Sequence, residues 1–272
     1  MDQLDQGTVL FGFRSEKYPG VPCYGTIITA SCDIANNKVG KLYYLIGVEA
    51  RQWFCTEHSY HVVYKEKREN LVGQLRQKFQ DVSLNLEALQ NFSEEEVDFV
   101  IEQEVSKQKV QDNLKKIYRE HLLFCKQSMD SAERKLAIQA DSNPAVKFLC
   151  GVEKGEIFHY YYLPEKAYLK NNEMNTGLII DLQEIGSISM EDAKRIITPG
   201  IDNWILQDED AQECARLRRL FWLEEKDDFV GIEGEISSPW REHLMQRFSH
   251  DFARIGLDGA KKSNYVQLLK NI

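Results

Sequence analysis

The sequence of residues 41–48 is Lys-Leu-Tyr-Tyr-Leu-Ile-Gly-Val, and the chain changes character soon after it. This stretch is rich in aromatic and β-branched residues and follows a turn-forming Asn36-Asn37 pair, which is typical of a β-strand. From about residue 56 to residue 140 there is almost no glycine and no proline, and apolar residues recur at helical spacing, as at Leu71, Leu75 and Phe79. The sequence therefore predicts that a long helical segment begins directly after this strand.

Further strand signals lie on both sides of the helical segment. Residues 7–15 and 23–30 precede it, and residues 157–163 and 177–188 follow it. The simplest assembly joins both groups of strands into one small sheet or barrel, with the helices as an insertion. We therefore predict an α+β fold in which residues 1–50 and 150–272 form a β-barrel-like domain and residues 51–149 form the helical insertion.

Helix caps mark three elements in this pattern. Ser93 and Glu96 fit a capping box, and Ser189 is placed to cap a short helix that stops before Pro199. The last helix is predicted to run from Pro239 to Ile255, with Ser238 as its N-cap. Its apolar stripe is expected to pack on the sheet and consists of Trp240, Leu244, Phe248, Phe252 and Ile255.

Composition excludes several classes of protein. No apolar run approaches the roughly 20 residues of a membrane helix, and the acidic N-terminus does not resemble a secretory signal, so we expect a cytoplasmic protein. The net charge of −9 argues against non-specific coating of nucleic acids. The six cysteines are scattered and predict free thiols without structural zinc. Phosphate-loop, dinucleotide and nucleophile-elbow motifs are missing, so no cofactor is expected.

Ser31-Cys32-Asp33 is the first candidate for chemistry, because it follows the second predicted strand. The Cys32 thiol could act as a nucleophile if a base lowered its pKa, and Asp33 would be its neighbour. The favoured interpretation is structural: a largely buried, unreactive Cys32, with Asp33 opening the following turn.

Histidines give a second candidate. His58 and His61 are three residues apart on a predicted helix and could share a metal ion if His121 or His159 supplied a third ligand. The spacing matches no known catalytic zinc motif. Ordinary surface histidines without a metal are the favoured interpretation.

A third candidate lies on the last helix, opposite its apolar stripe. Four potentially cationic residues recur there in one row, bordered by Glu242 and Asp251: His243, Arg247, His250 and Arg254. We expect this row to face solvent. The favoured interpretation is a solvated helix face with internal ion pairs. The alternative, which makes these four residues the candidate binding site, is a docking face for a partner protein or for RNA or DNA.

Two segments resemble a family of uncharacterised bacterial proteins. They are residues 29–34, Thr-Ala-Ser-Cys-Asp-Ile, and the tail from Ser238 to Leu257, with Tyr162-Leu163-Pro164 and residues 178–181 between them. The strand-rich part is similar to the SH3-like barrel of MazF/PemK-type toxins, which cleave RNA. Their catalytic signature is not recognisable here, so the resemblance implies a barrel and no activity.

Three functional hypotheses follow. The favoured one is a non-catalytic binding component of a bacterial multi-protein system, such as a defence or toxin–antitoxin system, and its support is partly by analogy. The alternative is a MazF-like endoribonuclease. The third is a cysteine-dependent hydrolase that uses Cys32. A protein partner is expected, RNA or DNA is the alternative partner, and no membrane is involved.

Overall fold

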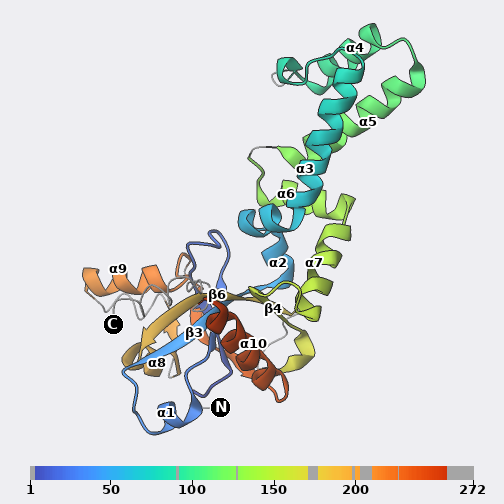
Figure 1. The fold of residues 1–272 in the computed structure, drawn as a ribbon. Coiled ribbons are helices and arrows are strands. Elements are labelled where there is room, and N and C mark those ends of the chain that lie inside the picture. Colours follow the sequence, from blue (N-terminus) through green and yellow to red (C-terminus); the bar gives the residue numbers. More distant parts are fainter. Residues whose placement is uncertain are drawn as a thin grey trace, which may run out of the picture. The chain divides into compact units, whose positions relative to one another are not determined.

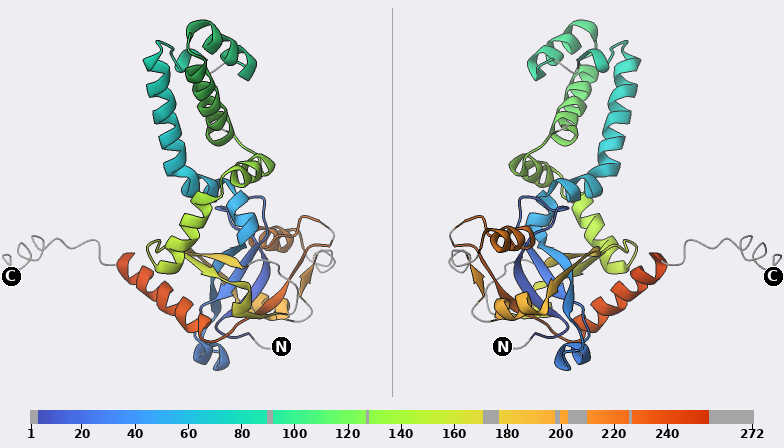
Figure 2. Two further views of the ribbon diagram at one scale, coloured as in Figure 1. Left: turned by 90° about the vertical axis from the view of Figure 1, so that its right-hand side faces the viewer. Right: turned by 90° about the vertical axis from the view of Figure 1, so that its left-hand side faces the viewer.

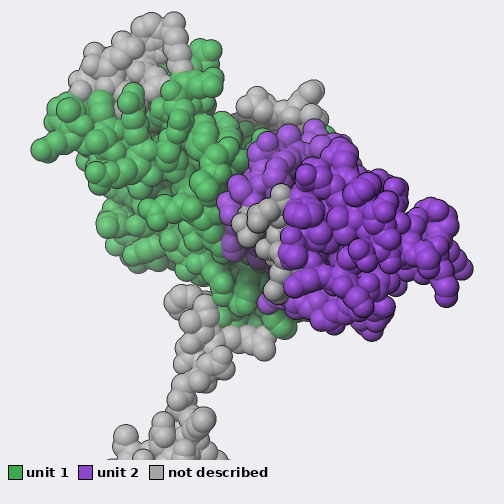
Figure 3. Space-filling model, turned by 90° about the horizontal axis from the view of Figure 1, so that it is seen from above, with its two compact units in different colours: residues 1–53, 149–272 green, residues 54–148 purple. Residues whose placement is uncertain are grey.

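The chain forms two compact units. The computed structural model describes residues 4–89, 92–126, 128–170, 177–197, 200–202, 210–225 and 227–255 (Figure 1). Residues 1–53 and 149–272 form unit 1, and residues 54–148 form unit 2 (Figure 3). Unit 1 contains an antiparallel sheet with helices and unit 2 is helical, so the predicted α+β class is confirmed. Within the described residues, no helix combines the length and apolarity needed to cross a membrane.

The sheet of unit 1 contains strands from both ends of the chain. Its strands are β1 (Thr8–Phe13), β2 (Cys23–Ile27), β3 (Lys41–Glu49), β4 (Tyr160–Leu163), β5 (Tyr168–Lys170), β6 (Leu178–Ser189), β7 (Ile201–Asp202) and β8 (Phe229–Ile236). Their order is β4-β6-β3-β2-β1-β8-β5, and β7 also pairs with β8. The prediction that the early and late strands share one sheet is therefore confirmed. Pairing between the described strands runs from β4 to β5 without closing, so the sheet is open and is not a closed barrel.

The pairing of β3 with β6 joins the two groups of strands. It extends from Lys41 opposite Ser189 to Glu49 opposite Leu178, and its register shifts once, between Leu45 and Ile46. On its other edge, the first part of β6 pairs with β4. Strand β6 is therefore the link between the N-terminal strands and the sheet edge formed by β4.

Helices cover both faces of this sheet. Helix α10 (Trp240–Ile255) places the buried Leu244 in an apolar cluster with Val9, Leu45 and Ile180. Helix α8 (Met190–Ile197) contacts β3, β6 and β8, and α9 (Ala211–Leu220) follows it. Figure 2 shows α8 and α9 on the other side of the sheet from α10. Two covered faces explain why residues 44–48 of β3 and residues 178–182 of β6 are buried at every position and almost entirely apolar.

Helix α10 packs on the sheet through its apolar stripe, as predicted. Leu244 is buried, and the half-buried Trp240 and Phe248 pack against the same cluster. The prediction missed Asp251, which is also buried, because an apolar stripe does not reveal a buried polar residue. The side chains of Phe252 and Ile255 lie outside the described residues.

Unit 2 is built from helices that pack through two apolar clusters. Its elements are α3 (Glu57–Asp81), the 3₁₀ turn η1 (Glu87–Leu89), α4 (Glu94–Glu104), α5 (Gln108–Cys125) and α6 (Ser131–Ala140). Leu71, Leu75 and Phe79 lie on one helix, as their spacing predicted, and Leu75 and Phe79 pack with α4 and α5. The predicted capping box of Ser93 and Glu96 is also confirmed at the start of α4. The chain enters this unit through α2 (Ala50–Cys55) and leaves it through α7 (Asn143–Lys154).

Two short elements complete unit 1. Helix α1 (Ser31–Ala35) follows β2, and the 3₁₀ turn η2 (Glu165–Ala167) follows β4. The Ala167 carbonyl accepts hydrogen bonds from the backbone N–H and the hydroxyl of Ser237, at 2.8 Å each. These bonds hold the backbone in position shortly before α10 begins.

A buried carboxylate anchors the β1–β2 connection to the sheet. Asp181 of β6 is 1% exposed, and its Oδ2 accepts hydrogen bonds from Lys17 Nζ at 2.5 Å and Tyr18 Oη at 2.7 Å. Its Oδ1 accepts from the backbone N–H of Gln183 at 3.0 Å. Burial, and then the Asp181 charge, raise the pKa of Tyr18, so its hydroxyl remains a donor at all ordinary pH values. The carboxylate is therefore balanced by a cation and two further donors.

Replacing Lys17 with Met should destabilise unit 1 by about 2–3 kcal/mol, because it leaves a buried carboxylate without its counter-charge. All four tryptophans belong to unit 1, so tryptophan fluorescence during urea unfolding measures this unit. Lys38→Met, at an exposed lysine, is the matched control and should change stability by less than about 0.5 kcal/mol. Equal stability of the two variants would contradict the anchoring role.

Candidate functional site

A cavity of about 250 Å³ lies beside α10 in unit 1. Three elements supply its walls: the last turns of α7, the edge strand β4 with the residues after it, and the first two turns of α10. The lining residues are Val152, Glu153, Tyr161, Tyr162, Pro164, Trp240, His243 and Arg247. The cavity therefore combines aromatic walls with two potentially cationic side chains and one carboxylate.

Local structure explains how α10 faces this cavity. Trp240, His243 and Arg247 are spaced at i, i+3 and i+7, which places them along one side of a helix. Leu244 lies next to this side and is fixed in the apolar cluster on the sheet. Because Leu244 holds the helix against the sheet, the neighbouring side chains are directed over the β4 edge.

Tyr161 and His243 are joined across the cavity. The Tyr161 Oη atom lies 3.0 Å from His243 Nδ1, and the two rings meet edge to face with centroids 5.4 Å apart. Burial raises the pKa of Tyr161 to about 12, although nearby Arg247 opposes this shift. The hydroxyl is therefore protonated at neutral pH and can donate to Nδ1 of a neutral imidazole. In that tautomer His243 Nε2 carries a proton and is a donor.

Arg247 is half-buried at one end of the cavity. Its Nη2 donates to the Ile157 carbonyl at 3.2 Å, and Nη1 lies against Gly155. Gly155 has φ of +74°, which favours glycine, and a Cβ atom there would displace the Arg247 guanidinium from its present position. No ion pair among the described residues includes Arg247, so its charge is available to a ligand.

The structure changes the prediction for the cationic row. His243 and Arg247 come together at the cavity, whereas the exposed His250 stacks on Phe158 with ring centroids 6.3 Å apart. The expectation that all four side chains face solvent is wrong for Arg247, because the 155–157 turn receives its guanidinium. The Arg254 side chain lies outside the described residues.

Asp251 is a second correction on the same helix. We expected it to border the exposed row, but it is 4% exposed and lies 3.4 Å from His159 Nδ1. This contact holds the C-terminal part of α10 near the start of β4.

Sequence reasoning missed Tyr161 and Tyr162 as cavity residues. The available signal was the run of three tyrosines, residues 160–162, directly before Leu163-Pro164. Successive side chains of a strand point to opposite faces, so three consecutive tyrosine rings cannot all be buried on the same face of the sheet. The run therefore indicates that an aromatic ring is left for another contact.

The prediction that Cys32 is buried is wrong. Residues 31–35 form α1 in place of a strand end, and this turn directs Ile34 inward and leaves Cys32 exposed. The Cys32 thiol lies 3.8 Å from the Asp33 carboxylate, a contact with an acceptor and not with an activating cation. The pair therefore lacks the electropositive surroundings typical of a nucleophilic cysteine.

The histidine candidates are engaged elsewhere. His61 Nδ1 contacts the Arg68 guanidinium, and its Nε2 lies 3.8 Å from Glu57. Burial lowers the pKa of His121, which stacks on Tyr118. Within the described residues, no group of three His, Cys, Asp or Glu side chains is placed to hold a metal ion.

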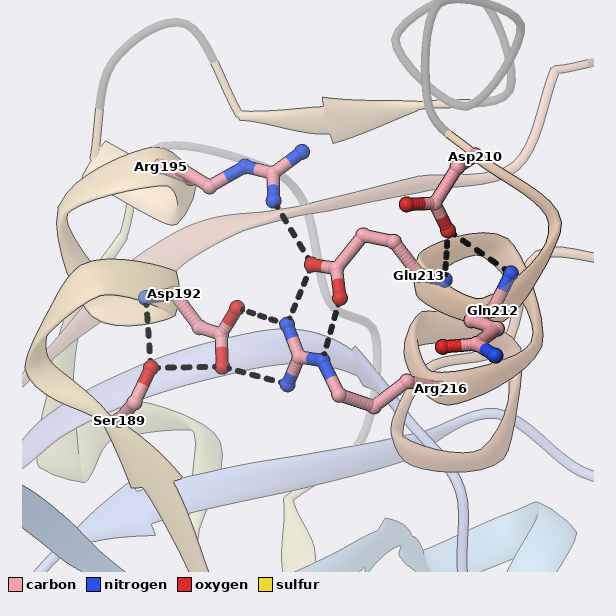
Figure 4. Close-up of polar contacts among 7 residues, drawn as sticks. All are labelled: Ser189, Asp192, Arg195, Asp210, Gln212, Glu213 and Arg216. Carbon is pink, nitrogen blue, oxygen red and sulfur yellow. Dashed lines mark hydrogen bonds and ion pairs between the residues drawn. The ribbon is translucent and has the colours of Figure 1, made fainter.

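A second polar cluster joins α8 and α9 (Figure 4). Arg216 forms a two-pronged contact with the buried Asp192, at 2.6 and 2.9 Å, and also binds Glu213. Ser189 caps α8 by accepting from the Asp192 backbone N–H, as predicted. Glu213 also pairs with Arg195, so it lies between two arginines. Because its charges are paired internally, this cluster is structural.

Comparison with known proteins assigns no function to the α10 cavity or to the α8–α9 cluster. No family model, curated protein or solved structure matches the chain. The functional argument therefore rests on the α10 cavity, where the Arg247 guanidinium, which forms no ion pair with the described residues, meets aromatic walls.

The α8–α9 cluster should make unit 1 sensitive to acid. Burial alone would raise the pKa of Asp192, but hydrogen bonds from Arg216 and Ser189 outweigh burial and lower this pKa. The hydrogen bond from Arg216 also lowers the pKa of Glu213. Carboxyl groups with lowered pKa values stabilise the fold above their unfolded-state pKa of about 4 and lose this contribution as the pH falls below it.

The urea midpoint of tryptophan fluorescence should consequently fall between about pH 4 and pH 2. In Arg216→Met this part of the pH dependence should be smaller, whereas Arg219→Met, on the same helix, should retain it. An identical acid profile for Arg216→Met and the wild type would contradict the role of this cluster.

Cysteine labelling tests the corrected position of Cys32. Cys32 and Cys150 are exposed and should react first with iodoacetamide in the native protein. Cys23 should react last, because burial, followed by the charge of Glu184, raises its pKa to about 12. Mass spectrometry of labelled peptides gives the order. Protection of Cys32 would contradict its exposure, and a rate far above that of Cys150 would favour the hydrolase hypothesis.

Proposed function

We propose that this chain is a non-catalytic binding component of a bacterial multi-protein system, such as a defence or toxin–antitoxin system. In this proposal unit 1 holds its partner at the α10 cavity. The observation that carries the proposal is the convergence of Trp240, Arg247 and Tyr161 on one cavity. Tryptophan, tyrosine and arginine are the residue types that dominate binding energy at protein interfaces.

The placement of the reactive groups supports binding over catalysis. Cys32 lies in α1, where its contact is the Asp33 carboxylate, and His243 donates or accepts within a pair with Tyr161. A nucleophilic mechanism needs a nucleophile and a base within hydrogen-bond reach of each other. Cys32 has no base among the contacts described above. His243 does contact the Tyr161 hydroxyl, but burial raises the pKa of that phenol to about 12, which disfavours its phenolate form.

The bacterial setting of the proposal comes from the family resemblance of the sequence, and a cytoplasmic location is part of the same proposal. A distant relation to SH3-like barrels is also part of the proposal. Its support is the antiparallel sheet with register shifts in the β1 and β3 pairings, since such irregularities bend strands.

Co-expression with the products of the neighbouring genes tests the proposal. The full-length chain should retain one of these proteins through affinity purification. Arg247→Gln should lose most of it, because the substitution removes the unpaired charge of the cavity. Gln246→Glu is the matched control: it changes the net charge by the same amount at an exposed position outside the cavity and should retain the partner.

Two results would contradict this function. The first is retention of the partner by Arg247→Gln at the wild-type level. The second is cleavage of RNA by the purified chain, with or without EDTA, since that result would favour the MazF-like endoribonuclease.

A further inference from the structure

The size of the α10 cavity limits what it can hold. Its volume of about 250 Å³ is below the range of about 300–1,000 Å³ that is usual for sites enclosing a whole small-molecule ligand. Three aromatic rings, from Tyr161, Tyr162 and Trp240, and the ring of Pro164 form most of its apolar wall. A cavity of this size and lining suits one bulky side chain that a larger partner inserts.

The polar end of the cavity selects the charge of the occupant. The Arg247 guanidinium has five N–H donors, and the Ile157 carbonyl uses one of them. His243, with Nδ1 facing Tyr161, offers a further N–H from Nε2. A planar carboxylate matches a guanidinium through two parallel hydrogen bonds.

The surroundings favour a single carboxylate over a polyanion. Glu153 lines the same cavity and repels additional negative charge. The net charge of the chain is −9, which opposes the dense phosphates of a nucleic acid. A peptide that carries one acidic residue meets Arg247 without this wider repulsion.

Building on the proposed function, we infer that the α10 cavity takes an aromatic side chain of a partner protein, and that a neighbouring Asp or Glu of the same segment binds Arg247. The aromatic ring packs against Tyr161 and Trp240, where offset or edge-to-face contacts are available. The carboxylate fixes the direction of the segment along α10.

A defined peptide library tests this inference on the full-length chain. Its members are capped Gly/Ser peptides that carry one Phe, Tyr or Trp and one Asp or Glu at every separation from one to four residues. Fluorescence polarisation should find members that bind the wild type. Replacing their aromatic residue with Ala should abolish binding, and replacing the acid with its amide should weaken binding about tenfold, or about 1.4 kcal/mol.

A double-mutant cycle links the carboxylate to Arg247. Arg247→Gln should bind the acidic and the amide peptides equally, whereas Gln246→Glu should discriminate between them as the wild type does. Circular dichroism shows that each variant is folded. Equal discrimination by Arg247→Gln, or no binding by any aromatic and acidic member, would overturn the inference.

A labelled single-stranded RNA decamer is the competing probe. Binding of this RNA that depends on Arg247, without peptide binding, would replace the peptide with a nucleic acid. If the co-expressed partner depends on Arg247 but the library fails, this inference falls and the proposed function stands. If the partner is retained without Arg247, the proposed function itself fails.

Discussion

The pairing of β3 with β6 is the interaction on which the rest of unit 1 depends. It joins strands that precede and follow the whole of unit 2, and it runs the full length of β3, from Lys41 to Glu49. The length of this connection adds little to the free-energy cost of pairing the two strands, because the entropic cost of closing a loop rises only logarithmically with its length. Once β6 is in place, its other edge holds β4, and its faces receive α8 and α10.

The cavity beside α10 results from this arrangement. Strand β4 is the last strand at its end of the sheet, so α10 extends over a sheet margin as well as over a sheet face. Leu244 fills the apolar cluster, and the residues beside it turn toward the margin. The contrast with α8 and α9 is informative. There Arg216 is neutralised by two carboxylates of its own unit, whereas no such carboxylate pairs with Arg247 in the described structure.

Local signals allowed much of the fold to be predicted from the sequence. The change from strand to helical periodicity after residue 48, the capping box at Ser93 and the Ser189 cap each depend on neighbours within a few residues. The errors concern properties set by distant contacts. Helix α1 is too short to show a period, so Cys32 was expected to be buried. The contacts of Asp251 with His159 and of Arg247 with the Ile157 carbonyl join residues 92 and 90 positions apart in the chain, so no local pattern reveals them.

The insertion also has a consequence for the topology of unit 1. Unit 2 comprises residues 54–148, so unit 1 keeps residues 50–53 after β3 and residues 149–159 before β4. Strands β3 and β4 both pair antiparallel with β6 and therefore run parallel to each other. Parallel strands need a crossover connection of about a dozen residues or more, and the segment that contains unit 2 is that crossover. Its returning arm carries Val152 and Glu153 to the cavity wall, so the crossover also builds part of the candidate site.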